Sequence, residues 1–222
     1  MTLPRLVIFG TGGFAREVHQ LVEDVNALKP TWDFVGFLDG NQKAHGTQVH
    51  GMPVLGGVEW LAGQEGINVV IGVGGTPSRS RIAAQISQTS KAHFPVLIHP
   101  LAWVGNRVDI GEGTIVCAGT RITTDIRIGR HALLNLDVTV GHDCDIRDFC
   151  TFSPGANISG NVRIGVGCDI GTNATVIQGL SIGHWTVVGA GAVVVKDLGA
   201  NITAVGSPAK PIKERLEGWH LA

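Results

Sequence analysis

An apolar residue recurs at every sixth position over the C-terminal half of the chain, with no polar member in the series. A period of six fits neither an α-helix nor an ordinary strand, because each unit needs a short strand and a turn. We therefore predict a left-handed parallel β-helix, in which three hexads make one triangular coil and the apolar residue points inward. Seventeen hexads predict about five to six coils, stacked at the strand spacing of about 4.8 Å. The series is Ile98, Val104, Ile110, Val116, Ile122, Ile128, Leu134, Val140, Ile146, Phe152, Ile158, Ile164, Ile170, Val176, Ile182, Val188 and Val194.

Small side chains usually stand four positions after these apolar residues. The tight corners of a triangular coil have room only for such side chains. Cys144, Cys150 and Cys168 belong to this set, so we expect buried thiols that pack as small apolar groups in a reducing compartment. Together with Cys117 they also lack the paired short spacing of a zinc site.

Residues 1–95 lack the hexads and instead alternate between short apolar strands and helical spacing. This alternation predicts a small α/β domain with a Rossmann-like parallel sheet, whose ligands bind at the carboxyl ends of the strands. The β-helix is expected over 96–200, and a C-terminal tail with a short helix over 201–222. The predicted strands are Leu6–Phe9, Phe34–Leu38 and Val69–Val73, and the predicted helices are Phe14–Leu28 and Ser78–Ser87.

A glycine-rich loop follows the first predicted strand. Its residues Gly10, Gly12 and Gly13 precede a helix, whose N-terminus and backbone amides favour a phosphate. Asp39 closes the second strand and offers a carboxylate to ribose hydroxyls or base N–H groups, and Gly74 follows the third strand. A tight turn with a solvated aspartate is the alternative interpretation. A domain of under about 100 residues is too short for a full dinucleotide fold, so a mononucleotide or a nucleotide sugar is favoured.

Composition narrows the classes of function. The formal net charge is -1 and the basic residues are scattered, so the electrostatic footprint of a nucleic-acid binder is missing. No apolar run approaches the roughly 18 residues of a membrane span, and the apolar start is too short for a secretory signal. We therefore expect a soluble cytoplasmic protein with a small nucleotide ligand.

One histidine occupies a position of the hexad repeat at which packing does not require a histidine. His142 lies two residues after the inward Val140, so it is expected to project outward at a coil edge. Gly160 has the same place one coil later, where it leaves room for a thioester and turns its N–H toward a carbonyl oxygen. An imidazole titrates near neutrality and suits a general base, and Asp143 would hold its tautomer. A surface histidine without a role is the alternative.

Several motifs together resemble one family over nearly the whole chain. The sequence is similar to the sialic-acid O-acetyltransferase-like family of hexapeptide-repeat acyltransferases, and within it to bacterial N-acetyltransferases of nucleotide-linked 4-amino sugars. The resemblance implies acetyl-CoA in the groove between neighbouring β-helices of a homotrimer, with His142 as the catalytic histidine and the nucleotide on the N-terminal domain. Relatives often have Glu after this histidine, where this chain has Asp143. The motifs are Gly10–Gly13, Phe37–Asp39, Ile98–Pro100, Val140–Asp143, Ser159–Val162 and Gly206–Lys210.

The resemblance also implies substrates and contacts. We expect transfer of an acetyl group from acetyl-CoA to the amine of GDP-perosamine or of a UDP-4-amino-4,6-dideoxy sugar, for surface polysaccharide or glycan synthesis such as that of O-antigen. The expected acetyl-CoA contacts are Gly160, Thr151, Ala190 and Lys210, and no metal is expected. Direct attack in a ternary complex is expected, because no Ser or Cys stands at the outward coil edge as a nucleophile.

Alternatives stay open. Oxygen acetylation needs the same base, so the residues do not separate a hydroxyl acceptor from an amine. A non-enzymatic trimer that binds nucleotide sugars would keep the glycine loop without acetyl-CoA. A zinc carbonic anhydrase on the same coil needs three converging histidines, and His131 and His142 have no third in register. Asp39 accepts from guanine or uracil alike, so GDP and UDP sugars both fit.

Overall fold

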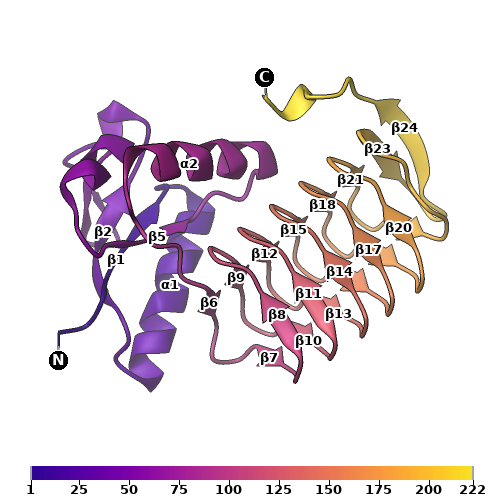
Figure 1. The fold of residues 1–222 in the computed structure, drawn as a ribbon, viewed down its shortest axis with the longest axis horizontal. Helices are drawn as coiled ribbons and strands as arrows, with labels where there is room; N and C mark the ends of the chain where they lie inside the picture. Colours follow the sequence, from indigo (N-terminus) through magenta and orange to yellow (C-terminus); the bar gives the residue numbers. More distant parts are fainter. Residues whose placement is uncertain (1, 222) are drawn as a thin grey trace. The chain divides into compact units, whose positions relative to one another are not determined.

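The computed structural model describes residues 2–221 and divides into two compact units (Figure 1). The N-terminal unit ends at Pro100 and the C-terminal unit begins at Leu101, so the division lies beyond the expected residue 95. The N-terminal unit is an α/β sheet, and the C-terminal unit is a left-handed β-helix, as the hexads predict.

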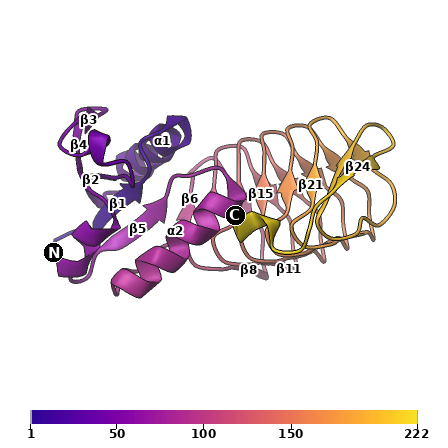
Figure 2. The ribbon, with the colours of Figure 1, turned by 90° about the horizontal axis from the view of Figure 1, so that it is seen from above.

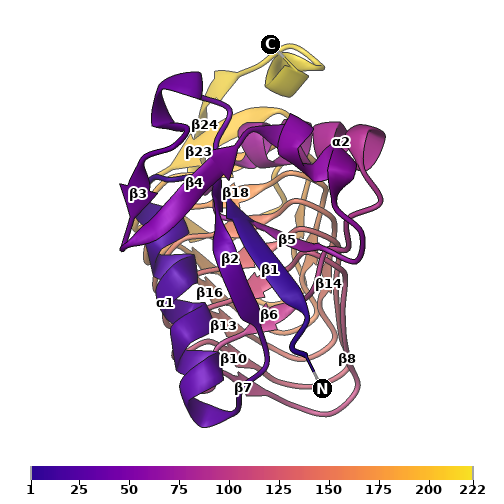
Figure 3. The ribbon, with the colours of Figure 1, turned by 90° about the vertical axis from the view of Figure 1, so that its left-hand side faces the viewer.

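The N-terminal unit contains a five-stranded sheet in the order β3-β4-β2-β1-β5 (Figure 3). The strands are parallel except for β3, which runs antiparallel to β4. The three predicted strands are present as β1, β2 and β5. The strands are β1 (Arg5–Phe9), β2 (Asp33–Leu38), β3 (Gln48–Val49), β4 (Met52–Gly56) and β5 (Asn68–Ile71), and 3-10 turns η1 (Gln42–Ala44) and η2 (Val58–Gly63) lie between them.

Two helices cover opposite sides of this sheet (Figure 2). Helix α1 (Gly13–Leu28) buries one stripe that contains Ala15, Val18 and Leu21, which gives it the amphipathic spacing found in the sequence. Helix α2 (Thr76–Thr89) starts with a proline in its first turn, where the missing N–H costs nothing. Both predicted helices are thus confirmed, with α2 extending slightly at each end.

The C-terminal unit stacks short parallel strands on three faces (Figure 2). From β7 to β22 each strand pairs with the strand 18 residues away, as Thr139 does with Asn157, whereas β21 and β23 pair at a spacing of 16. The first face has β7 (Trp103–Val104), β10 (Arg121–Ile122), β13 (Thr139–Val140), β16 (Asn157–Ile158), β19 (Thr175–Val176) and β22 (Val193–Val194). The second has β8 (Val108–Ile110), β11 (Ile126–Ile128), β14 (Asp145–Ile146), β17 (Arg163–Ile164) and β20 (Ser181–Ile182). The third has β9 (Ile115–Val116), β12 (Leu133–Leu134), β15 (Thr151–Phe152), β18 (Asp169–Ile170), β21 (Val187–Val188), β23 (Ile202–Val205) and β24 (Lys210–Glu214).

The inward series forms the core of the coil. Every sixth residue from Val116 to Val194 is buried, and the Phe152 ring is fully enclosed among them. The prediction is wrong at Ile98, which is 38% exposed. In the short strand β6 (Leu97–Ile98), Leu97 is the buried residue instead.

The small corner residues make a repeated hydrogen bond. Cys144, Cys150 and Cys168 are buried, and each thiol donates to the backbone carbonyl 15 residues further along, at 3.0–3.2 Å. Thr114 and Thr120 donate in the same way through their hydroxyls. Besides its expected packing role, each of these cysteines therefore satisfies one backbone acceptor.

The segment over 201–222, expected as a tail with a short helix, adds two strands to the coil. Strand β23 continues the third face in parallel, and β24 returns antiparallel to it. The 3-10 turn η3 (Trp219–Leu221) follows, and the His220 ring stacks on Trp185 with centroids 3.6 Å apart. Desolvation lowers the pKa of His220, which favours a neutral ring in this stack.

Candidate active site

His142 lies at the outer edge between the first and second faces of the coil. Its side chain is 65% exposed, as the hexad position predicts, and Nδ1 lies 2.7 Å from Oδ2 of Asp143. Asp143 adopts a left-handed backbone (φ 59°), which turns its carboxylate back toward the preceding ring. Since a carboxylate only accepts, it holds the proton on Nδ1 and leaves Nε2 as the basic nitrogen.

Gly160 lies directly against the imidazole in the next coil. A Cβ at this position would stand 2.6 Å from both Nε2 and Cε1 of His142, so no larger residue fits without moving the ring. The N–H of Gly160 donates to no protein acceptor within residues 2–221. The same residue thus offers an unused backbone donor, and backbone N–H groups suit a developing oxyanion.

A polar cluster stands one coil before this pair. Asp143 N donates to Thr124 O at 3.3 Å, which fixes the two corners as neighbours. Nε of Arg107 donates to Asp125 Oδ1 at 2.7 Å, and its Nη2 donates to Thr124 Oγ1 at 3.1 Å. The hydrogen bond raises the pKa of Arg107 and lowers that of Asp125, so both groups are charged.

The other expected acetyl-CoA contacts lie on different parts of the coil. Thr151 is in β15 of the third face and is only 6% exposed. Ala190 stands at the edge between β21 and β22, and Lys210 begins β24; both are exposed. One chain thus places only Gly160 beside His142, and the other three contacts stay predictions.

The expected nucleotide-binding residues gather at the carboxyl edge of the N-terminal sheet. Gly10 follows β1, Asp39 follows β2, and Gly74 lies in the loop after β5, while these three strands are neighbours. Gly10 has φ 114°, and an added Cβ would stand 3.0 Å from Gly72 O, so only glycine fits there. Gly12 caps α1 with no side-chain bond, and Gly13 is its first residue, so the helix N–H groups stay open.

The Asp39 carboxylate is held by its own loop. Thr11 Oγ1 donates to Oδ2 at 2.6 Å, and Asn41 N donates to Oδ1 at 2.8 Å. His45 Nε2 lies 2.7 Å from the backbone oxygen of Asp39. The carboxylate is thus oriented at the edge where the glycine loop lies, and each oxygen keeps acceptor capacity for a ligand.

Arg79 is a further residue at this edge, and no sequence pattern indicated it. This arginine in α2 is 1% exposed, and its Nη1 donates to the carbonyls of Val73 at 3.1 Å and Gly74 at 2.8 Å. Its guanidinium therefore shapes the loop after β5 that closes the carboxyl edge. An arginine in an amphipathic helix gives no signal of burial, since most are solvated.

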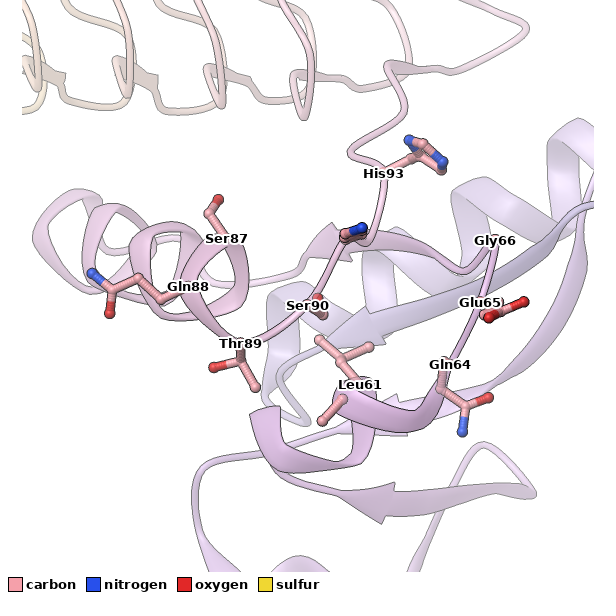
Figure 4. Close-up of a pocket in the computed structure, with 11 residues that line it drawn as sticks. Leu61, Gln64, Glu65, Gly66, Ser87, Gln88, Thr89, Ser90 and His93 are labelled. Atoms are coloured by element: carbon pink, nitrogen blue, oxygen red, sulfur yellow. The ribbon is translucent and has the colours of Figure 1, made fainter.

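A separate cavity of about 830 Å³ lies at the opposite edge of the N-terminal unit (Figure 4). Its lining comes from residues just before β5 and from the end of α2, and Leu61 and Thr89 border it. The cavity lies at the start of β5 and the end of α2, whereas Gly10 and Asp39 lie at the edge where β5 ends and α2 begins. It therefore takes no part in the expected nucleotide site.

Within 2–221, no group of three His, Cys, Asp or Glu side chains is arranged to hold a metal ion. Neither described α-helix combines the length and the apolar character that a bilayer crossing requires.

Comparison with known proteins places this geometry in a family. Residues 5–86 match the model of the PglD N-terminal domain. The chain is 33% identical to GDP-perosamine N-acetyltransferase of Escherichia coli O157:H7, over 93% of this chain and 95% of that protein.

Solved structures agree. A perosamine N-acetyltransferase from Caulobacter crescentus, in which one histidine is replaced by asparagine, was solved in complex with CoA and GDP-perosamine. It matches with TM-score 0.85 and 31% identity, over 96% of this chain and 99% of that chain. The acetyltransferase domain of PglB from Neisseria gonorrhoeae FA1090, in complex with acetyl coenzyme A, matches with TM-score 0.86 and 33% identity, over 95% and 100% of the two chains. The chain therefore belongs to the sialic-acid O-acetyltransferase-like family of hexapeptide-repeat acyltransferases, in the acetyl-CoA-dependent group that includes the GDP-perosamine N-acetyltransferases.

Proposed function

We propose that this chain transfers the acetyl group of acetyl-CoA to the amino group of a nucleotide-linked 4-amino sugar, with His142 as the general base. The observation that carries the proposal is the exposed imidazole that Asp143 orients and that lies against Gly160, a residue without a side chain. Relatives that match nearly the whole chain are named N-acetyltransferases and bind CoA with GDP-perosamine. An amine acceptor is thereby favoured over a hydroxyl.

The reaction follows from these groups. The neutral amine attacks the thioester carbonyl carbon, and Nε2 of His142 takes the proton that the nitrogen loses. The carbonyl oxygen becomes an oxyanion and accepts a hydrogen bond from the N–H of Gly160. When the C–S bond breaks, the CoA thiolate leaves and takes the proton from the imidazolium, which Asp143 has stabilised.

Attack is direct in this mechanism. Cys144 is the thiol nearest in sequence to His142, but it is buried and donates to Ser159 O at 3.2 Å. Burial raises the pKa of the Cys144 thiol, so it stays protonated and is a poor nucleophile. No acetyl-enzyme is therefore expected, and mass spectrometry of the protein after exposure to acetyl-CoA alone checks this.

The nucleotide is assigned to the carboxyl edge of the N-terminal sheet. The amides at Gly12 and Gly13 suit the phosphates, and Asp39 suits a base or ribose. GDP-perosamine is the first acceptor to test because structures in the family hold it, and a UDP-4-amino-4,6-dideoxy sugar is the second. Four free, buried cysteines and the use of acetyl-CoA agree with a cytoplasmic enzyme in surface-glycan synthesis.

The decisive experiment measures CoA release with acetyl-CoA and a panel of GDP-, UDP- and dTDP-linked amino sugars. Turnover with one 4-amino sugar, and none with the matching 4-hydroxy sugar, is expected. Transfer to the hydroxyl sugar instead would make the chain an O-acetyltransferase. Binding of a nucleotide sugar without any binding of acetyl-CoA would make it a non-enzymatic binder.

A further inference from the structure

A buried histidine of the N-terminal unit meets an exposed histidine from another element. His19 lies in α1 and is 5% exposed, and its Nδ1 stands 3.4 Å from Nδ1 of His50, which is exposed. Phe34 and Phe37 of β2 pack against the His19 ring, with ring centroids 4.4 and 5.4 Å away. An imidazole in an aromatic environment therefore takes a second imidazole as its hydrogen-bond partner.

His50 stands in a hairpin turn that favours a different residue. The two residues between Val49 and Met52, which pair across β3 and β4, are His50 (φ 47°) and Gly51 (φ 74°). Positive φ at both central residues is the pattern of a type I′ turn, for which Asn-Gly is a preferred pair. Histidine gives the turn no advantage over asparagine, but it supplies the ring that reaches His19.

The number of protons on the two rings decides whether this contact holds. With both rings neutral, or with one of them protonated, one Nδ1 donates and the other accepts. The first proton is expected on the exposed His50, because burial opposes a charge on His19. Once both rings are protonated, both Nδ1 atoms are donors and both rings are positive, so repulsion replaces the hydrogen bond.

The surroundings of His19 set the pH at which this happens. Desolvation lowers the pKa of His19, the Glu23 carboxylate one turn further along α1 raises it by less, and His50 lowers it again. From β2, the rings of Phe34 and Phe37 face His19 and carry no charge. An unfolded histidine has a pKa of about 6.5, so the contact stabilises the fold above that pH and is lost as the pH falls through the lowered value.

The hairpin belongs to the segment that holds Asp39. The Asp39 N–H donates to Gly56 O at the end of β4, at 2.9 Å, and Nε2 of His45 lies 2.7 Å from the backbone oxygen of Asp39. Within the hairpin, Gly46 N donates to Val54 O at 2.9 Å. The turn, β4 and the Asp39 loop are thus one hydrogen-bonded segment.

We propose that the His19–His50 contact is a proton-sensitive latch, which holds the β3–β4 hairpin on α1 near neutral pH and releases it in acid. Through this hairpin the latch keeps Asp39 in place for a nucleotide. The link to the nucleotide rests on the proposed function, whereas the latch itself does not.

Hydrogen-exchange mass spectrometry of peptides over 46–54 tests the latch without any ligand. Protection is corrected for the intrinsic exchange rate at each pH. Between about pH 7.5 and about pH 5, wild type is expected to lose at least about tenfold in protection. His50→Asn suits the left-handed turn and offers His19 both a donor and an acceptor, so its protection is expected to change by less than about twofold.

His93→Asn is the matched control, because it removes another exposed histidine of the same unit. It is expected to show the wild-type loss of protection. Circular dichroism checks that each protein stays folded at both pH values. Wild-type protection that does not depend on pH, or an equal loss in His50→Asn, would overturn the latch.

Titration calorimetry with GDP, and separately with UDP, tests the link to Asp39. Wild type and His50→Asn are expected to bind alike near pH 7.5, and His50→Asn at least about threefold more tightly near pH 5. Comparing the two proteins at one pH cancels the titration of the nucleotide phosphate and of His45 and Glu59, which both proteins share.

The two measurements separate the possible failures. Equal affinities of the two proteins near pH 5 would overturn the link to Asp39, while the exchange pattern still decides the latch. Wild type that binds neither nucleotide at either pH would contradict the nucleotide site of the proposed function as well as this link.

Discussion

His142 differs from the other residues of its coil edge through its two neighbours. Equivalent positions one coil away hold Thr124 and Gly160, and neither is titratable. Asp143 orients the ring from one side, and the missing side chain of Gly160 gives it room on the other. The site is therefore a local exception on a regular scaffold, made by a few residues.

Replacing His142 by Ala removes the proposed base. We expect kcat to fall by about a hundredfold or more, with little change in KM for either substrate, because the imidazole acts mainly in the transition state. Steady-state kinetics with acetyl-CoA and the preferred nucleotide sugar measures this. His184→Ala, which removes another exposed histidine of the coil, is the matched control and should keep wild-type kcat. Full turnover by the His142 variant would disprove the assignment.

Gly160→Ala tests the contact rather than the base. The new Cβ would meet Nε2 and Cε1 of His142 at 2.6 Å, so the ring must move from its present position. We expect kcat to fall at least about tenfold while the melting temperature changes little, since the residue lies at an outer edge. Gly63→Ala, at a glycine with open space around its added Cβ, is the control. Wild-type kinetics in Gly160→Ala would show that the ring is free to move.

At the level of elements, the coil was the most predictable part of the molecule. Each hexad places one apolar residue inside the coil. A strand of two residues such as β13 cannot shift by one residue, because the shift would turn its apolar residue outward. The N-terminal strands with long apolar runs, such as Leu6–Phe9, were equally clear. The sequence did not reveal β3 and β4, because Gln48–Gly56 combines short apolar stretches with glycine and proline.

The site was less predictable than the fold. His142 was found because it occupies an outward position of the hexad, where packing does not require a histidine, and Asp39 because it ends a strand. Arg79 escaped because its burial depends on a loop from another part of the sequence. A contact between segments of different parts of the sequence is invisible to a local pattern.

The core of the coil gives a prediction about stability. Phe152 is fully buried among the inward aliphatic residues, so Phe152→Ala would leave a cavity that the short, closely paired strands cannot fill. We expect a loss of about 3–5 kcal/mol in the free energy of unfolding, measured by urea titration. Val166→Ala, at a position that is 37% exposed, is the control and should cost much less. Equal losses for the two variants would contradict the assigned core.

At the scale of the whole molecule, the proposed function needs more than one chain. Within one chain, the residues Thr151, Ala190 and Lys210 lie away from the edge of the β-helix that carries His142. A groove shared between neighbouring copies would bring such residues to the thioester, which is why we propose a homotrimer with cyclic symmetry.

Light scattering coupled to size-exclusion chromatography tests the trimer. The expected mass is that of three chains of 23.3 kDa each. Activity should decline on dilution once the subunits separate, because each site would lose the residues its neighbour supplies. A chain that is monomeric at all concentrations and still fully active would rule out the shared groove.

The regular stacking of the coil also sets a rule for changes in chain length. Successive strands on one face are 18 residues apart. An insertion of one full turn between His142 and β23 would carry the β23–β24 hairpin about 4.8 Å further along the axis with its orientation kept. A six-residue insertion would instead rotate everything beyond it onto the adjacent side of the triangle. Only whole turns therefore change the spacing between the His142 edge and the hairpin without rotating the hairpin about the axis.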